Sequence, residues 1–498
     1  MGRILGLISP VNGVKNSFRK KIAYAIRLWI YKKNVSYIKV VADNNIGFYR
    51  VEEKEELIRD MKNIKGSYVL IGFYSKDEIG VSKFNNLVSD SLFFTKDGLK
   101  YAPAFEEKIH EIFSQTNRFS DLLTEMDSLD SNFSVIIVDK RKFIIKRDKL
   151  GVKPLWFSFK DGHLILSSER KVLYKFVQSS NVSPLIPRDA IIVDNDKMKF
   201  IKEISEVNYK FYNEYKSEEE IIESMHEFMI NAIKKRIPPN GKVTVLFSGG
   251  VDSTAMAILL KKVAPQVYGI SVGFEGAKDL EFSLKAAEKI NLKLYHKIIT
   301  DEDLNLAIPN AIFATEEFNP IRISVATTFY LANTLAKNKG FDIVFSGTGS
   351  EEIFAGYQKY LELRSIGLDF VHEATIYGLR NIWIRDLYRD DTIAFHSGVV
   401  GVFPYLDKDL VDFSMKIHPK YKVSESEKKV IFRKYAEWLG VPKEIAWRPK
   451  IAAQYGSGMV KGLRRYIRKK GYQHIIDMFY TCLLYTSDAA DELDGVDL

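Results

Sequence analysis

A glycine pair beside hydroxyl and carboxylate side chains forms the first candidate site. The stretch SGGVDS (residues 248–253) lies between a short apolar run and a helix-like run. Gly249 and Gly250 lack a Cβ, so the backbone there can turn tightly and a ligand can approach it closely. Ser253 or Asp252 is expected to cap the following helix, whose first-turn N–H groups suit a phosphate. The turn therefore predicts an anion-binding site.

A second glycine-rich turn carries an acid pair. In the stretch DIVFSGTGSEEIF (residues 342–354), an apolar run leads into Ser346, and Glu351 and Glu352 open the next helix. Ligands of open parallel sheets bind beyond the carboxyl ends of the strands, so the two turns can face one crevice. Asp252 and Glu351 would then place two carboxylates beside a phosphate, an arrangement that suits Mg²⁺. The alternative is that the acid pair only stabilises the start of its helix.

A third stretch, WRPKIAAQYGSG (residues 447–458), supplies cations. Arg448 and Lys450 flank a proline and precede a glycine-rich segment. A cation held here could neutralise the charge that develops on a reacting phosphate, although a lone lysine is more often solvated. The first turn lacks the lysine of a GxxxxGK[ST] motif, so a γ-phosphate is not its obvious target.

The elements that must position these turns change type along the chain. Short alternating runs separated by turn residues predict an α+β domain over residues 1–210. From Ser217 onward, amphipathic helix-length segments alternate with short apolar runs, which predicts a parallel sheet with helical crossovers. These apolar runs are residues 242–247, 266–274, 292–299 and 341–347. The segment from about residue 360 to residue 480 is expected to be mostly helical, without clear strands.

Composition restricts the class of protein. The apolar content of 46% and the aromatic content of 13% are typical of a globular chain. No apolar run approaches the ~20 residues needed to cross a bilayer, and the first residues lack the apolar core of a signal peptide, so we expect a cytoplasmic protein. Lys and Arg are spread along the whole chain without a nucleic-acid motif, so neither nucleic acid nor a membrane is expected as a partner.

The last residues are excluded from the predicted fold. Residues 482–498 resemble a translated sequencing adapter and contain the only cysteine, Cys482. The tail holds five acidic residues and no Lys or Arg, so the chain's net charge of +9 becomes +14 without it. With no other cysteine, the remainder is expected to have neither a disulfide nor a cysteine-ligated metal.

Together, these motifs resemble the asparagine synthetase family. The second half of the chain carries, in order, SGGVDS, SVGFEGAKDL, SGTGSEEIFAGY, FPYLD and WRPKIAAQYGSG, and the first half carries RDKLGVKPLW and LILSSERK. SGGVDS is similar to the PP-loop of ATP pyrophosphatases. The resemblance implies a degenerate class II glutamine amidotransferase-like domain at residues 1–210, with the αββα sandwich of Ntn hydrolases. It implies a PP-loop domain at residues 217–480, with the parallel α/β sheet of adenine nucleotide α-hydrolase-like proteins.

The resemblance also implies a reaction and its residues. A carboxylate attacks the α-phosphate of ATP, giving an acyl-adenylate and pyrophosphate, and ammonia then displaces AMP. Lys450 would stabilise the adenylation transition state, Thr348 would stand beside the acceptor nitrogen, and Asp252 and Glu351 would hold Mg²⁺. For Val272, a plain core position is an equal alternative to adenosine binding. The residues that would bind ATP are Leu246, Ser248, Gly249, Gly250, Asp252, Ser253, Val272, Ser346 and Gly347.

Three positions depart from the family pattern. Gly2 stands where the glutaminase carries its cysteine nucleophile, and a glycine cannot form the thioester, so no glutamine hydrolysis is expected. Thr348 stands where asparagine-forming members have a glutamate and β-lactam-forming members a tyrosine, and threonine is not a useful base at neutral pH. Glu351 replaces an aspartate and is one methylene longer.

Three functional interpretations therefore stay open. The leading one is asparagine synthesis from aspartate, with ammonia that is free or supplied by a partner protein; a homodimer is also compatible with the sequence. The second keeps adenylation but transfers the acyl group to an amine of the substrate or of a peptide, as in β-lactam synthetases and lasso-peptide cyclases. The third is a non-catalytic relative that only binds nucleotide.

Overall fold

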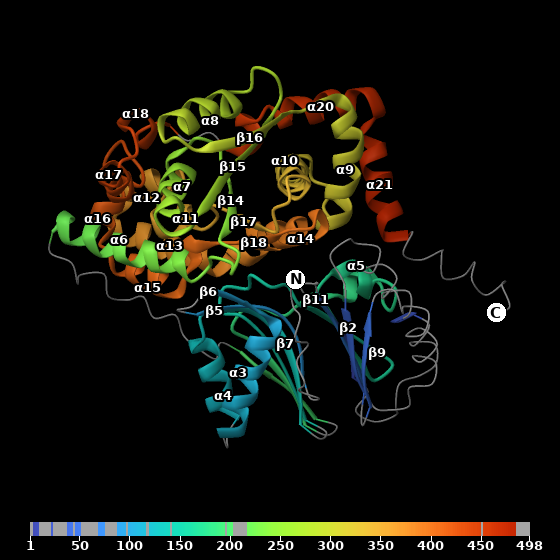
Figure 1. Cartoon of the computed structure of the whole chain (residues 1–498). Helices are drawn as coiled ribbons and strands as arrows, with labels where there is room; N and C mark the ends of the chain where they lie inside the picture. Colours follow the sequence, from blue (N-terminus) through green and yellow to red (C-terminus); the bar gives the residue numbers. More distant parts are fainter. Residues whose placement is uncertain are drawn as a thin grey trace. The chain divides into compact units, whose positions relative to one another are not determined.

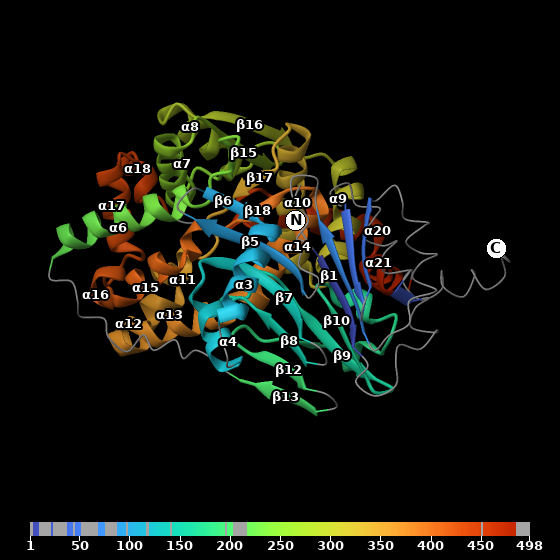
Figure 2. The same cartoon turned by 60° about the horizontal axis from the view of Figure 1, so that its bottom comes forward.

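The computed structural model of this chain divides into two compact units. The first comprises Met1–Phe93, Lys100–Glu206 and Ile476–Leu498, and the second comprises Phe94–Leu99 and Val207–Ile475. Figures 1 and 2 show the chain from two directions. The residues that the structure describes are 3–8, 21–22, 37–42, 45–50, 68–74, 87–95, 98–115, 119–139, 142–194, 197–202, 217–449 and 452–484.

Two antiparallel sheets dominate the N-terminal unit. One has seven strands in the order β11-β9-β10-β1-β4-β2-β3, and the other has six in the order β13-β12-β8-β7-β5-β6. The described elements are β1 (Arg3–Ile8), β2 (Tyr37–Ala42), β3 (Asn45–Arg50), β4 (Tyr68–Tyr74), β5 (Leu87–Thr95), β6 (Gly98–Tyr101), α3 (Ala102–Gln115), α4 (Phe119–Ser128), β7 (Ser131–Asp139), β8 (Lys142–Arg147), β9 (Trp156–Lys160), β10 (His163–Ser167), α5 (Arg170–Leu173), η2 (Ser179–Asn181), β11 (Ser183–Pro184), β12 (Ala190–Asp194) and β13 (Lys197–Ile201).

The core of this unit lies between the two sheets. Alternate residues of a strand point to opposite faces, and the inward set from both sheets, including Ile4 and Ile136, is fully buried. Helices α3 and α4 cover the opposite face of the six-stranded sheet, where Phe105 stacks on Phe133 at a centroid distance of 4.9 Å (Figure 2). Among the described residues, this gives two stacked sheets with a helical layer on one of them, in agreement with the predicted sandwich of an Ntn-type glutamine amidotransferase domain.

Buried ion pairs join the two sheets near the start of β1. Arg3 on β1 donates from Nη1 to Asp90 Oδ2 on β5 at 2.9 Å, and from Nε to Glu169 Oε1 at 3.2 Å. Lys153 Nζ lies 3.2 Å from Asp90 Oδ1, and Lys171 Nζ lies 2.5 Å from Glu169 Oε2. All five side chains are buried, so the charges that face this part of the interior are compensated by one another, as buried ions require.

The second unit is built around a parallel sheet. Its five strands have the order β16-β15-β14-β17-β18, with β14 in the centre. The strand segments of this unit are β14 (Lys242–Leu246), β15 (Gln266–Gly273), β16 (Lys293–Ile298), β17 (Ile343–Phe345) and β18 (Val400–Val402). The first four match the apolar runs of the sequence, as expected for strands that are covered on both faces. This confirms the predicted parallel-sheet domain.

Helices cover both faces of this sheet. In Figure 1, α6 and α7 lie on one side of it, and α9, α10 and α14 lie on the other. The helices of the unit are α6 (Glu218–Lys234), α7 (Val251–Val263), α8 (Lys278–Lys289), α9 (Asp301–Thr315), α10 (Pro320–Asn338), α11 (Ser350–Ile353), α12 (Lys359–Ile366), α13 (Leu368–Ile382), the π-helix η3 (Trp383–Leu387), α14 (Tyr388–Ser397), η4 (Pro404–Leu406), α15 (Lys408–Lys416), α16 (Pro419–Lys422), α17 (Val430–Leu439), α18 (Lys443–Ala446), α19 (Ala453–Gly456), α20 (Met459–Lys470) and α21 (Tyr472–Leu484), the last of which runs on into the first unit.

The C-terminal part contains one strand that was not predicted from the sequence. The segment expected to lack strands contains β18, which pairs in parallel with β17. A strand of three residues is too short to show a recognisable alternation of apolar and polar residues in the sequence. No helix among the described residues has the length and hydropathy needed to cross a membrane.

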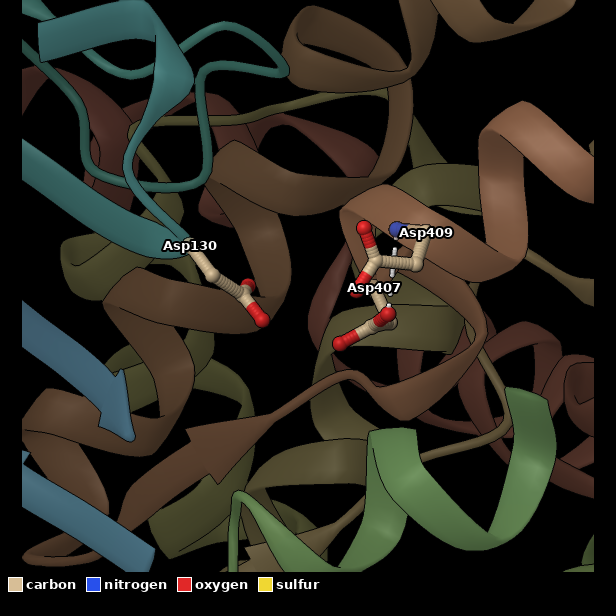
Figure 3. Close-up of side chains that lie close together, drawn as sticks. All are labelled: Asp130, Asp407 and Asp409. Atoms are coloured by element: carbon tan, nitrogen blue, oxygen red, sulfur yellow. Dashed lines mark hydrogen bonds between the residues drawn. The ribbon is translucent and has the colours of Figure 1, made fainter. Parts of the chain in front are cut away.

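The FPYLD motif ends at a helix cap. Asp407 accepts a hydrogen bond from the backbone N–H of Asp409 at 3.1 Å at the start of α15, as Figure 3 shows. Its other carboxylate oxygen accepts from Arg236 Nη1 at 2.7 Å and lies 2.9 Å from Lys235 Nζ. Burial alone would raise the pKa of Asp407, but Arg236 and Lys235 together lower it. Asp130, also drawn in Figure 3, belongs to the N-terminal unit.

Candidate functional site

The turn at residues 248–253 joins the central strand β14 to helix α7. Gly249 has φ +66°, and a Cβ there would lie 2.5 Å from the Phe282 carbonyl oxygen, so only glycine fits. The N-cap of α7 is Gly250, with an extended backbone and no side-chain hydrogen bond to the first turn. The N–H groups of this helix end therefore have no side-chain cap, which leaves them suited to an anion.

The predicted cap of this helix was wrong. Helix α7 begins at Val251, one residue before Asp252, so neither Asp252 nor Ser253 occupies the N-cap position. The Ser253 hydroxyl donates to the Gly250 carbonyl at 3.2 Å. Neither side chain therefore occupies the cap position in front of the first-turn N–H groups of α7.

The carboxyl ends of β14, β15 and β17 open onto one cavity of about 560 Å³. One part of its wall is apolar and contains Leu246, Ile270, Val272 and Ala332. Val272 is the next-to-last residue of β15, the neighbour of the central strand, and is only 6% exposed. The predicted site residues that line the cavity are Leu246, Ser248, Gly250, Asp252, Ser253, Val272, Ser346, Gly347, Thr348 and Glu351.

Two predicted residues are not among the lining set. Gly249 lies in the turn itself, and its carbonyl oxygen accepts a hydrogen bond from Arg448 Nη1 at 3.3 Å. Lys450 lies outside the described residues. Its neighbours Arg448, Pro449 and Ala452 line the cavity. Arg448 is held there by Asp279, whose Oδ1 accepts from Nη2 at 3.0 Å, so the WRPK segment delivers at least one fixed cation to the glycine turn.

The two predicted metal ligands converge on a buried lysine. Lys429 Nζ lies 2.6 Å from Asp252 Oδ1 and 3.1 Å from Glu351 Oε1, and it donates to Ser350 Oγ at 2.9 Å. Burial lowers the pKa of Lys429, and Asp252 opposes the shift. Two carboxylates that share one cation position and offer hard oxygen donors fit Mg²⁺. Sequence reasoning missed Lys429, because the surrounding SEKKVIFRK stretch reads as an ordinary charged helix.

A glycine makes this arrangement possible. At Gly356 an added Cβ would overlap the Glu351 carboxylate and Lys429 Cε. Its position just after the short helix α11 lets the backbone pass directly against both charged groups. Glycine is used where a chain must approach another group this closely.

Another part of the cavity wall contains Thr348 and charged side chains. The Thr348 hydroxyl donates to Asp390 Oδ2 at 2.7 Å and lies 3.0 Å from the Ser346 hydroxyl. Burial raises the pKa of Asp390, and Arg389, whose Nη2 lies 2.7 Å from Oδ1, opposes the rise. Thr348 lines the cavity, so its hydroxyl stands between the cavity and a buried carboxylate.

The π-helix η3 extends this charged wall. It places Arg385 and Asp386 on the cavity, and α14 adds Arg389. Arg385 Nε donates to Asp386 Oδ2 at 2.6 Å, and its Nη2 pairs with Glu352. Tyr357 donates to the same Glu352 carboxylate at 2.7 Å. Short π-helices are frequent at functional sites because the extra residue per turn re-aims side chains, and here charges of both signs alternate along the wall.

Two family models and several known proteins match most of the chain. The asparagine synthase family model matches residues 225–370 and 362–477, and the glutamine amidotransferase domain model matches residues 123–224. A protein of Methanocaldococcus jannaschii assigned as glutamine-hydrolysing asparagine synthetase 1 is 28% identical over 70% of this chain and 73% of its own length. Human asparagine synthetase is 25% identical over 70% of this chain and 67% of its own, and asparagine synthetase B of Escherichia coli is 26% identical over 67% and 62%.

Proposed function

Because this chain belongs to the asparagine synthetase family of ATP-dependent ligases, we propose that it makes an amide through an acyl-adenylate. The proposed substrates are aspartate, ATP and ammonia, and the products are asparagine, AMP and pyrophosphate. The observation that carries the proposal is the convergence of three strand ends, an uncapped helix start and two carboxylates on one cavity. Such a crevice suits a nucleotide with its phosphates at the glycine turn.

The first step transfers the α-phosphoryl group to the substrate carboxylate. Ser248, Gly249, Gly250 and Ser253 would hold the departing pyrophosphate, and the apolar wall with Ser346 and Gly347 would hold the adenosine. Asp252 and Glu351 would hold Mg²⁺, which supplies charge neutralisation on the phosphates when bound. Lys450 and the fixed guanidinium of Arg448 would stabilise the negative charge of the transition state.

The second step forms the amide bond. Ammonia attacks the acyl carbon, the bond to AMP breaks, and the nitrogen must lose one proton. Thr348 itself is no base, but its hydroxyl already donates to Asp390. We propose that the nitrogen proton passes to the Thr348 oxygen as the Thr348 proton passes to Asp390. The raised pKa of Asp390 suits this role, because a carboxylate of higher pKa is a stronger base.

The charged wall supports an amino acid as the carboxylate substrate. Arg385 offers a cation and Asp386 an anion at the cavity surface. Aspartate carries an α-ammonium and an α-carboxylate, so it can pair with both signs of charge.

The direct test measures products. The protein would be incubated with ATP, Mg²⁺, ammonium and a panel of acids, with pyrophosphate release followed continuously and amides identified by mass spectrometry. The proposal predicts asparagine and equal amounts of AMP and pyrophosphate. ADP and phosphate as products, or no turnover with any acid, would remove it.

A second candidate transfers the acyl group to an amine other than ammonia. Thr348 favours it, because this position carries a glutamate in asparagine-forming relatives of the kind the sequence resembles. The same product assay separates the two: asparagine from aspartate and ammonium excludes a dedicated cyclase, whereas pyrophosphate release that requires a larger amino-bearing acid supports one. A protein that only binds nucleotide would release no pyrophosphate. In such a protein Arg448→Met would change the nucleotide affinity, while pyrophosphate release would be absent from both the wild type and the variant.

A further inference from the structure

The ammonium group of Lys429 stands between the two carboxylates proposed to hold Mg²⁺. Nζ lies 2.6 Å from Asp252 Oδ1 and 3.1 Å from Glu351 Oε1, with Ser350 Oγ at 2.9 Å. We propose that Lys429 is a resident cation that keeps the metal site closed until nucleotide arrives, so that Mg²⁺ and nucleotide bind together. The inference rests on the proposed function, because it concerns the same metal and nucleotide site.

The position of Lys429 is fixed by the backbone and by packing. It has φ 57° and ψ 29°, a left-handed conformation that is uncommon for a residue with a side chain, at the N-cap of α17. The side chain is 3% exposed, its Cε borders Gly356, and its ammonium lies 5.8 Å from the centroid of the Phe432 ring. A residue in this conformation persists only where the surrounding structure fixes it, so the packing around Lys429 holds its ammonium group in place.

Charge balance explains why this lysine would couple the two ligands. Two largely buried carboxylates, with side chains 13% (Asp252) and 10% (Glu351) exposed, need a cation where they converge, and Lys429 supplies it in the nucleotide-free protein. A divalent cation entering between Asp252 and Glu351 would meet the ammonium at close range, and the like charges would repel one another. A triphosphate at the neighbouring glycine turn adds negative charge near both cations, which offsets their repulsion. Mg²⁺ alone is therefore disfavoured, and Mg²⁺ with nucleotide is favoured.

The coupling is measurable without any turnover. Mn²⁺, a paramagnetic stand-in for Mg²⁺, would be titrated into the full chain by electron paramagnetic resonance, with and without an ATP analogue that carries a methylene between the α- and β-phosphates. For the wild-type protein we expect the analogue to tighten Mn²⁺ binding by about 10-fold or more, within the usual range of coupling between sites. In Lys429→Met, nucleotide-free Mn²⁺ binding should be about 10-fold tighter than in the wild type, and the coupling should shrink.

Lys434→Met is the matched control. Lys434 lies on the same helix, α17, but pairs with Glu218 at half-exposed positions, so its loss should leave both Mn²⁺ affinities unchanged. Equal nucleotide-free Mn²⁺ affinity in the wild type and in Lys429→Met would overturn the proposal. So would an undiminished effect of the analogue on the variant.

Stability provides an independent measurement. Lys429→Met leaves Asp252 and Glu351 facing each other, so the variant should melt at a lower temperature, and Mn²⁺ alone should restore it. Should Lys429→Met not fold, Lys429→Gln removes the charge while keeping a hydrogen-bonding group, and the same titrations apply. If the wild type fails to bind the nucleotide analogue, the proposed function is wrong, whereas the nucleotide-free Mn²⁺ comparison still decides the role of Lys429.

Discussion

The hydroxyl of Thr348 connects the cavity to a carboxylate that no local sequence pattern points to. Asp390 lies 42 residues further along the chain and accepts the Thr348 hydrogen bond while it is 4% exposed. A threonine that is a poor base by itself thus has a buried base as its partner. Although Thr348 replaces the glutamate of asparagine-forming relatives, a carboxylate still lies one hydrogen bond away from this cavity residue.

The Asp390 role predicts a separation of the two steps. Asp390→Asn should lower amide formation by about 100-fold, as is usual for loss of a general base. Adenylation, measured as exchange of labelled pyrophosphate into ATP with the acid substrate, should change little. Thr348→Ser keeps the hydroxyl and should retain most of the amide-forming rate, whereas Thr348→Ala should behave like Asp390→Asn. An equal loss of exchange and amide formation in Asp390→Asn would show that the residue acts on the fold alone.

Lys422 gives a pH-dependent prediction for stability. It is 1% exposed, its Nζ has no hydrogen-bond partner among the described residues, and burial lowers its pKa from 10.5 to about 7. Between these two pH values the unfolded chain binds the proton that the folded chain has lost, so this group makes stability rise with pH across that window. Replacing it with an apolar side chain removes an unfavourable burial.

Lys422→Met should therefore raise the free energy of unfolding by ~1–3 kcal/mol at pH 7, the order of an uncompensated buried polar group. The gain should be smaller at pH 10, which lies close to the ordinary lysine pKa of 10.5, so that losing the proton on folding costs little there. Urea unfolding at the two pH values measures both. Lys420→Met, an exposed lysine on the same short helix, should change stability little, and a gain that grows with pH would contradict the assignment.

At the scale of elements, short turns do most of the positioning. The β14–α7 turn and the segment after α11 each depend on a glycine that allows two groups to approach closely. The π-helix η3 between α13 and α14 adds one more residue per turn and brings Arg385 and Asp386 to the cavity. These irregularities, more than the regular helices and strands, decide which side chains meet.

Gly356 tests this dependence. In Gly356→Ala the new methyl would overlap Glu351 and Lys429 Cε, so one or both must move. We expect a loss of ~1–3 kcal/mol in the free energy of unfolding, as for other overpacking changes. Binding of the magnesium complex of the ATP analogue, measured by calorimetry, should weaken clearly as well.

Gly367→Ala serves as the control for that substitution. Its Cβ would touch only the half-exposed side chain of Phe370 at 3.3 Å, which can move into solvent. Its nucleotide affinity should match that of the wild type. Similar affinities in Gly356→Ala and the control would mean that Glu351 and Lys429 do not act in the site.

At the scale of the whole molecule, the two units have separate roles in the proposed reaction. Every described residue that lines the cavity belongs to the second unit. The first unit has the fold of a glutamine amidotransferase domain, but Gly2, which lies outside the described residues, offers no nucleophile. The adjacent Arg3 is tied into buried ion pairs with Asp90 and Glu169.

We therefore predict that ammonium supports turnover and that glutamine does not. The measurement uses ¹⁵N-amide glutamine and ¹⁵N-ammonium in parallel, with the label in the product amide followed by mass spectrometry. Gly2→Cys alone should not restore glutamine-dependent turnover, because the motifs that form the glutamine pocket in the family are also not recognisable in this sequence, and a nucleophile needs bound glutamine to attack. Transfer of label from glutamine by the unmodified protein would disprove this prediction.

The amino-acid sequence by itself determined the glycine turn at residues 248–253, the alternation of strands and helices in the second unit, and Asp252 and Glu351 as a carboxylate pair. These features are local: a tight turn needs glycine, and buried parallel strands need apolar runs. Only the tertiary structure revealed Lys429, which lies 177 residues from Asp252, and the link from Thr348 to Asp390. A lysine or aspartate in a helical stretch looks the same in the sequence whether it is solvated or buried, because its partners come from distant segments that meet only when the chain folds.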